Sequence, residues 1–151
     1  MVETHLWVPG QVPPKGSAVA YPRPQGGVTV RQVNASSLAI WTATIRHAWA
    51  SLTPCPEPIP RGEPVEVEMH FYRVRPKGHY RGKAQTLRST APSQPPNPPD
   101  LDMLVRSALD ALKGLAYVDD GQVCGFGDTR KCYCTSDRPA PGVEIWVRRL
   151  L

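Results

Sequence analysis

The sequence contains no apolar stretch long enough to cross a membrane. A spanning helix needs roughly 18 or more consecutive apolar residues, and no segment of this 151-residue chain approaches that length. The N-terminal segment MVETHLWVPG also lacks the basic and then apolar layout of a signal peptide. We therefore expect a soluble, cytoplasmic protein.

A standard zinc-binding pattern is also missing. The cysteines are Cys55, Cys124, Cys132 and Cys134, and the spacing of the last three is not one that structural zinc sites use. In a reducing compartment, free thiols are the default state. We expect free thiols, with a thiol or zinc module built on the last three cysteines as the alternative.

Acidic residues are absent between Phe71 and Pro99. The same segment holds six Lys and Arg side chains, with His79 and Tyr80 among them, in a chain of formal net charge +5. Cations interleaved with aromatic rings favour a phosphate-binding surface, and a solvated charge run is the alternative. We expect these residues to bind the phosphates of a polyanion: Arg73, Arg75, Lys77, His79, Arg81 and Lys83, with Lys15 from an earlier loop.

Proline, by contrast, is abundant. The chain has 18 prolines, about twice the usual share. Together with 12 glycines they make up about a fifth of the sequence, which is below the level of low-complexity chains. We expect one folded domain over residues 1–151, with proline-rich loops at about 54–64 and 84–99.

Hydrophobic periodicity predicts the elements of this domain. Alternating apolar residues predict a strand in VEVEMHFYRV, and shorter patterns predict strands in THLWV, GQVCGFGDTRKCYC and GVEIWVRRL. Apolar residues at helical spacing predict helices from about Ser36 to Leu52 and from about Leu101 to Lys113. The segment PGQVPPKGSAVAYPRPQGG is expected to be a turn-rich loop. The result is an α+β fold, a mixed β-sheet covered by two main helices.

One face of the strand VEVEMHFYRV carries Glu66, Glu68 and His70. Residues two apart in a strand share a face, so the three side chains form a possible metal-binding row. We favour the simpler interpretation that they are solvated strand residues.

Four aspartates flank the second predicted helix. Asp100 and Asp102 stand at its start, and Asp119 and Asp120 follow its end. Helix capping explains Asp100 and a turn explains the later pair. If tertiary structure brings the two ends together, however, the carboxylates repel one another unless a divalent cation lies between them. Hard oxygen ligands select Mg²⁺ or Mn²⁺, and such an ion beside a basic surface suits metal-dependent cleavage of phosphodiesters.

The aspartate segment PPDLDMLVRSALDALKGLAYVDDGQV resembles the signature of the RusA family of Holliday junction resolvases, in which D-L-D-N, a helix with D-A-L, and D-D-x-Q-V follow one another. VPGQVPPKG is similar to the family's first strand and basic loop. RPKGHY is similar to its basic stretch, and PGVEIWV to its last strand. The resemblance covers most of the chain in the same order.

This resemblance implies a homodimeric, Mg²⁺-dependent endonuclease that resolves four-way DNA junctions by paired nicks, in a bacterial or phage-infected cell. The metal ligands would be Asp100, Asp102 and Asp120, with Asp119 as the second choice within its pair. The basic helix position that assists catalysis falls on Arg106, between Asp102 and Asp110 on the same helix face. The basic residues named above would contact branched DNA.

The chain departs from the family pattern at two positions. Met103 stands where asparagine is common and cannot donate or accept hydrogen bonds as an amide does. Arg106 stands where lysine is common; it keeps the charge but does not give up a proton near neutral pH. We therefore expect Arg106 to stabilise charge. The rival interpretation, favoured by Met103, is a non-catalytic DNA-binding module with a structural or degenerate acidic cluster.

Overall fold

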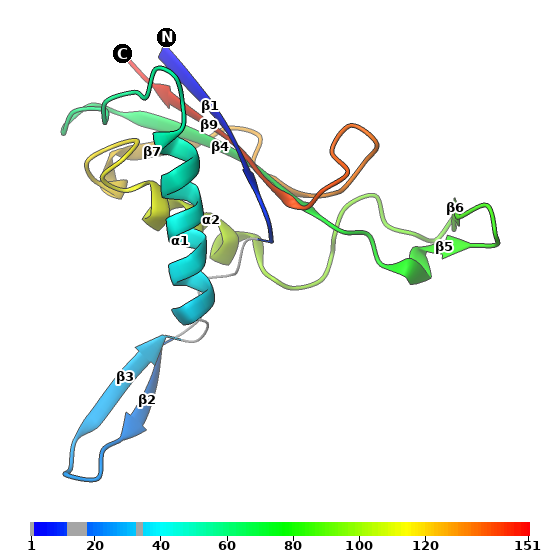
Figure 1. Ribbon diagram of the computed structural model, residues 1–151, viewed down its shortest axis with the longest axis horizontal. Helices are drawn as coiled ribbons and strands as arrows, with labels where there is room; N and C mark the ends of the chain where they lie inside the picture. Colours follow the sequence, from blue (N-terminus) through cyan, green and yellow to red (C-terminus); the bar gives the residue numbers. More distant parts are fainter. Residues whose placement is uncertain (1, 12–17, 33–34) are drawn as a thin grey trace.

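The chain folds around a mixed sheet that carries two long helices on one face (Figure 1). The structure is a computed structural model that describes residues 2–11, 18–32 and 35–151. The α+β prediction is confirmed. Within the described residues, no helix is long and apolar enough to cross a membrane.

The sheet combines antiparallel and parallel pairs. Strand β9 (Gly142–Arg149) lies between β1 (Val2–Pro9) and β4 (Val65–Arg73) and is antiparallel to both. The other edge of β4 pairs in parallel with β7 (Val123–Phe126) near its start and with β8 (Arg130–Tyr133) near its end. The first and last residues of the described sheet meet, because Val2 pairs with Arg149.

The segment GQVCGFGDTRKCYC forms two short strands, where the sequence predicted one. The break lies between Phe126 and Arg130, where the Gly127 N–H donates to the Val67 carbonyl at 3.1 Å and the Thr129 hydroxyl accepts from the Met69 N–H at 3.1 Å. A Cβ at Gly127 would stand 2.6 Å from a Glu68 carboxylate oxygen. Glycine therefore permits the close approach that splits the predicted strand.

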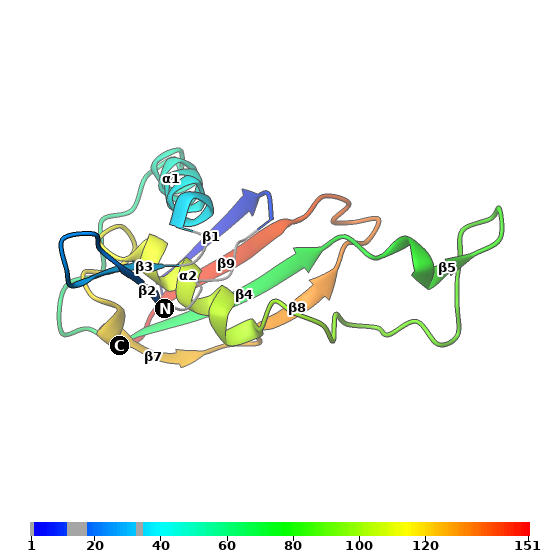
Figure 2. The same cartoon turned by 90° about the horizontal axis from the view of Figure 1, so that it is seen from below.

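Helices α1 (Ala35–Ala50) and α2 (Leu101–Leu112) begin and end within two residues of the predicted positions. Figure 2 shows both on the same side of the sheet. Gly114 follows α2 with φ +83°, a conformation that suits glycine at a helix end. The apolar faces of the helices and the inner face of the sheet form the core, which buries Leu6, Val8, Trp41, Ile45, Trp49, Val65, Val67, Met69, Phe71, Leu104, Val105, Ala108, Ala111, Leu112, Val143, Ile145 and Val147.

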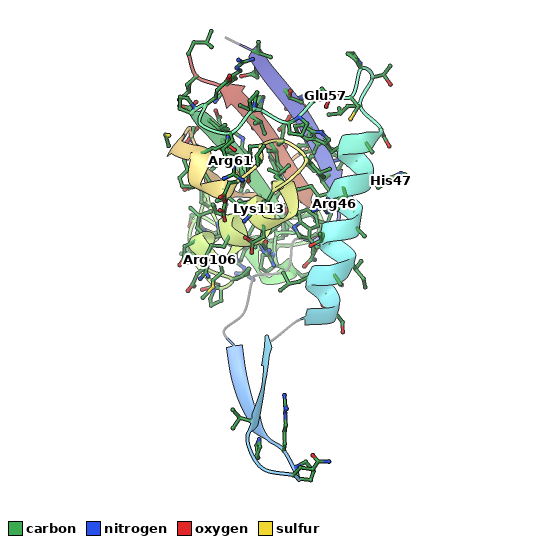
Figure 3. All side chains as sticks on the ribbon, turned by 90° about the vertical axis from the view of Figure 1, so that its left-hand side faces the viewer. Arg46, His47, Glu57, Arg61, Arg106 and Lys113 are labelled. Carbon is green, nitrogen blue, oxygen red and sulfur yellow. The ribbon has the colours of Figure 1, made fainter. Side chains whose placement is uncertain are left out.

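The loop predicted between the first strand and α1 contains a hairpin instead. Strands β2 (Ala18–Pro22) and β3 (Val28–Gln32) pair with each other and project from the body (Figures 1 and 3). Gly26 and Gly27 turn the chain with φ +92° and +77°, so the glycines that predicted a loop are the tip of a hairpin. Lys15, a predicted phosphate contact, lies outside the described residues.

The acid-free segment forms a second projection, which we call the basic arm (residues 74–99) (Figure 2). It contains the short 3₁₀ helix η1 (Lys77–His79) and the small strands β5 (Tyr80–Arg81) and β6 (Thr86–Leu87), which pair with each other. The sequence predicted a proline-rich loop over part of this segment, at about 84–99. It is largely irregular, with this small hairpin at its outer part.

The row Glu66, Glu68 and His70 faces away from the helices. Both carboxylates accept hydrogen bonds from Arg148, at 2.9 Å and 2.8 Å, and the row is half-buried. The interpretation as solvated residues is therefore wrong, because the side chains are half-buried and the two glutamates are bound by Arg148. Within the described residues no three His, Cys, Asp or Glu side chains are grouped to hold a metal, so the metal alternative for this row fails as well.

Candidate active site

The N-terminal end of α2 presents two exposed carboxylates. Asp100 is the residue before the helix, with φ −68° and ψ 144°, and its carbonyl accepts from the Leu104 N–H at 3.2 Å. Its carboxylate makes no capping hydrogen bond, so capping does not explain this side chain as the sequence suggested. Among the described residues, neither Asp100 nor Asp102 has a side-chain partner. The positive helix terminus favours their charge, and the carboxylates face solvent.

Strand β8 positions the chain that leads into these aspartates. The Lys131 ammonium donates to the carbonyls of Asn97 at 2.9 Å and Pro99 at 3.1 Å. These bonds tie the end of the basic arm to the sheet edge immediately before Asp100. Sequence reasoning missed this role, because Lys131 is far from Asp100 in sequence and only strand pairing brings the two together.

Asp102 and Arg106 share an open groove of about 580 Å³ beside α2. Its floor is apolar, and Phe126, which is 51% exposed, forms part of it. Arg106 is exposed and makes no ion pair with Asp102, so the expectation that carboxylates hold it on both sides is not met on the Asp102 side. The groove is lined by Leu101, Asp102, Val105, Arg106, Leu109, Phe126, Gly127 and Thr129.

The second aspartate pair lies at the opposite end of α2, among cations. The Lys113 ammonium stands 3.4 Å from Asp119 and 4.0 Å from Asp120, and Arg61 stands 3.9 Å from Asp119. Figure 3 shows Arg61 and Lys113 close together on the side of the molecule that also displays Arg106. Lys113 and Arg61 were not among the predicted site residues.

Asp119 has a structural task in addition to its charge. It begins the 3₁₀ helix η2 (Asp120–Gln122) and forms a capping box with Gln122, and its carboxylate accepts from the Gly121 N–H at 3.4 Å. A hydrogen bond with the Asp120 carboxyl, the Gly121 N–H and Lys113 together hold the pKa of Asp119 below its ordinary value. Asp120 has no capping role, which favours Asp120 over the equally exposed Asp119 as the functional member of the pair.

Gln122 is buried, and it joins the aspartate turn to the loop before β4. Its side-chain oxygen accepts from the N–H groups of Val118 at 3.0 Å and Asp119 at 2.9 Å. Its side-chain nitrogen faces three carbonyl oxygens, those of Ile59 at 3.3 Å, Pro60 at 2.8 Å and Glu63 at 3.1 Å. The sequence signal was present, a glutamine two positions after an aspartate pair, but its contacts depend on a loop 60 residues away.

The two aspartate pairs do not converge within one chain. Helix α2 has 12 residues, so its ends lie roughly 18 Å apart at 1.5 Å per residue. One pair stands at each end, and within the described residues no metal-holding group of acids is present. Within the described part of the chain, Asp120 is thus not grouped with Asp100 and Asp102.

At the base of the basic arm, Arg75 joins the arm to the sheet edge. Its guanidinium lies 4.0 Å from the centre of the Tyr133 ring and donates to the Pro92 carbonyl at 2.7 Å. His79 packs against the same ring and lies 3.3 Å from Arg75. Arg75 therefore joins the two ends of the arm through one of its terminal nitrogens.

The remaining basic residues of the arm divide into two kinds. Arg88 donates to the Gly78 carbonyl at 3.1 Å and so crosses the arm, and burial lowers the pKa of Arg73 at the end of β4. Lys77, Arg81 and Lys83 are exposed, and their side chains have no partner among the described residues. These three are the cations of the arm that remain available to a ligand.

The cysteines do not form a metal centre. All four are free thiols, and burial raises the pKa of Cys132 and of Cys134. The described residues contain no group of three His, Cys, Asp or Glu side chains suited to a metal. The structure therefore gives no support to the thiol or zinc alternative.

The exposed carboxylates at the start of α2 lie beside Arg106, and the basic arm leads into them. Carboxylates next to a cationic surface are an arrangement typical of nucleases. The family described as Endodeoxyribonuclease RusA matches residues 11–148. The chain belongs to this family of endodeoxyribonucleases. No curated protein matches the sequence significantly.

Proposed function

We propose that the protein is a Mg²⁺-dependent enzyme that resolves four-way DNA junctions by paired nicks, working as a homodimer. Membership of the RusA endodeoxyribonuclease family supports the reaction class. The observation that carries the rest is the position of the aspartates, with Asp100 and Asp102 at one end of α2 and Asp119 and Asp120 at the other.

A second copy resolves the separation of these pairs. Ligand oxygens on one small divalent ion lie within about 4 Å of one another, and the two pairs in one chain are too far apart for that. If two α2 helices lie antiparallel across a two-fold axis, Asp120 of each chain approaches Asp100 and Asp102 of the other. Two-fold symmetry then gives two equal sites, which is what a pair of symmetric nicks needs.

The groove beside α2 supports such a pairing. Leu101, Leu109 and Phe126 expose apolar surface along the helix face that also carries Asp102 and Arg106. Burial of this surface against a copy stabilises a dimer by the hydrophobic effect. The acidic residues would then lie at the rim of an apolar interface.

The chemistry of the donor set suits Mg²⁺ or Mn²⁺, because carboxylate oxygens prefer hard ions. Such an ion would supply the activation of water and the neutralisation of charge at the scissile phosphate. Arg106 contributes a fixed positive charge beside Asp102, and Lys83, Arg81 and Lys77 hold the flanking backbone. Product release leaves a nick in the DNA strand.

Mixed dimers test this proposal. Asp102→Asn and Asp120→Asn should each abolish nicking as pure proteins. When the two are unfolded together and refolded, each mixed dimer contains one site with both substitutions and one site with neither. Nicking of a labelled four-way junction should therefore return, to about a quarter of the wild-type site number, without paired cuts on the same junction.

The matched control is a mixture of Asp100→Asn with Asp102→Asn. Asp100 and Asp102 of one chain belong to the same site, so in the mixed dimer each of the two sites lacks one ligand. No site is intact, and activity should stay absent. Return of activity in the control, or none in the Asp102→Asn and Asp120→Asn mixture, would contradict the two-chain site.

A non-catalytic DNA-binding protein is the second candidate. Met103, which interrupts the family pattern beside Asp102, favours it, as does the neutralisation of Asp119 by cations of its own chain. Incubation of the protein with labelled four-way, forked and linear DNA, with and without Mg²⁺, separates the two. Binding without any cleavage would establish the second candidate.

A further inference from the structure

Gln122 is one of two buried polar residues in the described part of the chain. It is 8% exposed, and its amide is surrounded by backbone groups from two segments. Two N–H groups, of Val118 and Asp119, point at its oxygen, and carbonyl groups from the loop at residues 59–63 surround its nitrogen. The amide therefore supplies hydrogen-bond partners to part-buried backbone groups of both segments.

Only a side chain with both a donor and an acceptor end fits this position. The oxygen cannot be exchanged with the nitrogen, because the N–H groups lie on one side and the carbonyls on the other. Replacement by an apolar residue would leave several part-buried backbone groups without this partner, which costs free energy of folding. The requirement is for an amide, and not simply for a polar residue.

The contacts of Gln122 fix the backbone of the aspartate pair itself. The Asp119 N–H is one of its donors, and the turn that carries Asp120 lies between Asp119 and Gln122. The loop on the other side carries Arg61, which stands 3.9 Å from Asp119. One amide thus sets the distance between the acidic turn and the loop that brings a cation to it.

We propose that Gln122 is a positioning residue for the endonuclease reaction, which places the Asp119–Asp120 turn at the distance and angle from which Asp120 serves the active site. This inference rests on the proposed function. It assigns a role in cleavage to a residue that touches neither DNA nor metal. A misplacement of about 1 Å in a catalytic group can cost on the order of 10²-fold in rate.

Gln122→Glu tests the proposal through pH. A protonated glutamic acid has the shape of glutamine and donates one hydrogen bond to the carbonyls, whereas an ionised carboxylate faces them with a second negative oxygen. Burial and the carbonyl dipoles raise the pKa of the introduced acid above its ordinary value. The neutral form, and with it the native turn, therefore prevails at low pH and is lost as pH rises.

The measurement is the rate of single-turnover nicking at saturating concentrations of four-way junction. The rate of the variant is divided by that of wild type at each pH from about 6 to about 9, because raised carboxyl pKa values fall in this range. The ratio should fall on the order of 10²-fold across this range, while junction affinity stays within about twofold, a change too small to matter on the free-energy scale. Gln25→Glu adds the same charge at an exposed position, and its ratio should remain constant.

A ratio for Gln122→Glu that stays near one at every pH, in protein shown to be folded by circular dichroism, would overturn the proposal. Gln122→Met covers the case in which the acid variant unfolds at high pH. This variant keeps the length of the side chain without its hydrogen bonds, and it should lose nicking at all pH values while it binds junctions normally. Wild-type rates in folded Gln122→Met would equally count against a positioning role.

Hydrogen exchange separates this inference from the proposed function. In Gln122→Glu, the amides of residues 118–123 should exchange faster than in wild type at high pH and equally at low pH, after correction for intrinsic rates. This readout needs neither DNA nor metal. If wild type cleaves no DNA, the proposed function fails, and the exchange pattern still decides whether Gln122 holds the turn; unchanged protection would show that it does not.

Discussion

The two ends of helix α2 carry the same acidic side chains in opposite settings. At the N-terminal end, Asp100 and Asp102 are exposed and have no side-chain partner in the described structure. At the C-terminal end, Lys113 contacts both Asp119 and Asp120. The difference shows which carboxylates still need a cation: the first pair has only the helix dipole to balance it, whereas the second is neutralised within its own chain.

The basic arm repeats this division with the opposite charge. Arg75 donates to the Pro92 carbonyl and Arg88 donates to the Gly78 carbonyl, and these hydrogen bonds hold the arm together. Lys77, Arg81 and Lys83 have no partner in the described residues. Within the arm, the arginines with internal partners help to hold the structure, and the cations without partners are the candidates for contact with DNA.

The largest effect should come from removing a partnerless carboxylate. Asp102→Asn should abolish detectable nicking of a four-way junction, because it removes a metal ligand, and should leave junction binding intact, because the basic arm is untouched. The rate comes from single-turnover assays and the affinity from gel shifts in Ca²⁺. Asp137→Asn removes an exposed aspartate in the turn before β9 and should cleave normally. Near wild-type cleavage by Asp102→Asn would remove the distinction between the two ends of α2.

Arg106 should give the next largest effect. It shares the groove with Asp102 and has no ion pair with it, so its charge is free to meet a phosphate. Arg106→Ala should lose on the order of 10²-fold in single-turnover rate, and Arg106→Lys should keep much of it, because the charge remains. Equal loss in both variants would show that bidentate geometry matters more than charge.

The arm offers a smaller and graded effect. Replacing Lys77, Arg81 and Lys83 together with alanine should flatten the slope of log affinity against log salt by roughly two to three units, since each phosphate contact contributes about 0.9. Arg75→Ala should instead loosen the arm, which protease digestion detects as cleavage within residues 76–91. An unchanged slope in the triple variant would assign those three charges to solvent.

The elements that the sequence predicted well are those with strong local patterns. The alternation in residues 65–73 and the apolar spacing of α2 determine which face is buried before any tertiary contact is known. The β2–β3 hairpin and the break at Gly127 were missed for the same kind of reason. In both places glycine allows several conformations, and the choice depends on pairing or on the approach of Glu68.

The candidate site, like the fold, was predicted where the signal is local and missed where it depends on tertiary contacts. Motif and charge pattern identified Asp100, Asp102, Asp120 and Arg106 as candidates, and the basic arm as a cationic surface. They did not reveal that Arg75 is tied to Tyr133 or that Lys113 neutralises the second pair, because each contact joins residues whose distance is set by the fold. They left open whether the two pairs meet in one chain, and only the fold places Asp119 and Asp120 beside Lys113, at the end of the 12-residue helix opposite to Asp100 and Asp102.

The smallest effect concerns the neutralised end of α2 and its dependence on pH. The pKa of Asp119 is lowered in the folded protein, first by its hydrogen bond with Asp120 and then by Gly121 and Lys113. A lowered pKa means that the ionised carboxylate stabilises the fold at neutral pH, and that this contribution is lost as pH falls through the unfolded value near about 4 and below. Asp119→Asn keeps an oxygen for the cap, so the comparison isolates the charge.

Urea unfolding midpoints of wild type and Asp119→Asn should therefore differ by a small amount at neutral pH, because the contacts are exposed and screened. The difference should shrink below about pH 4 as wild type becomes protonated, and Asp137→Asn should show no such convergence. A difference that persists in acid would mean that the fold needs the geometry of the Asp119 cap and gains nothing from its charge. In that case the charge of Lys113 would be available to another negative group. The C-terminal end of α2 could then bind a DNA phosphate, just as the N-terminal end could bind a cation.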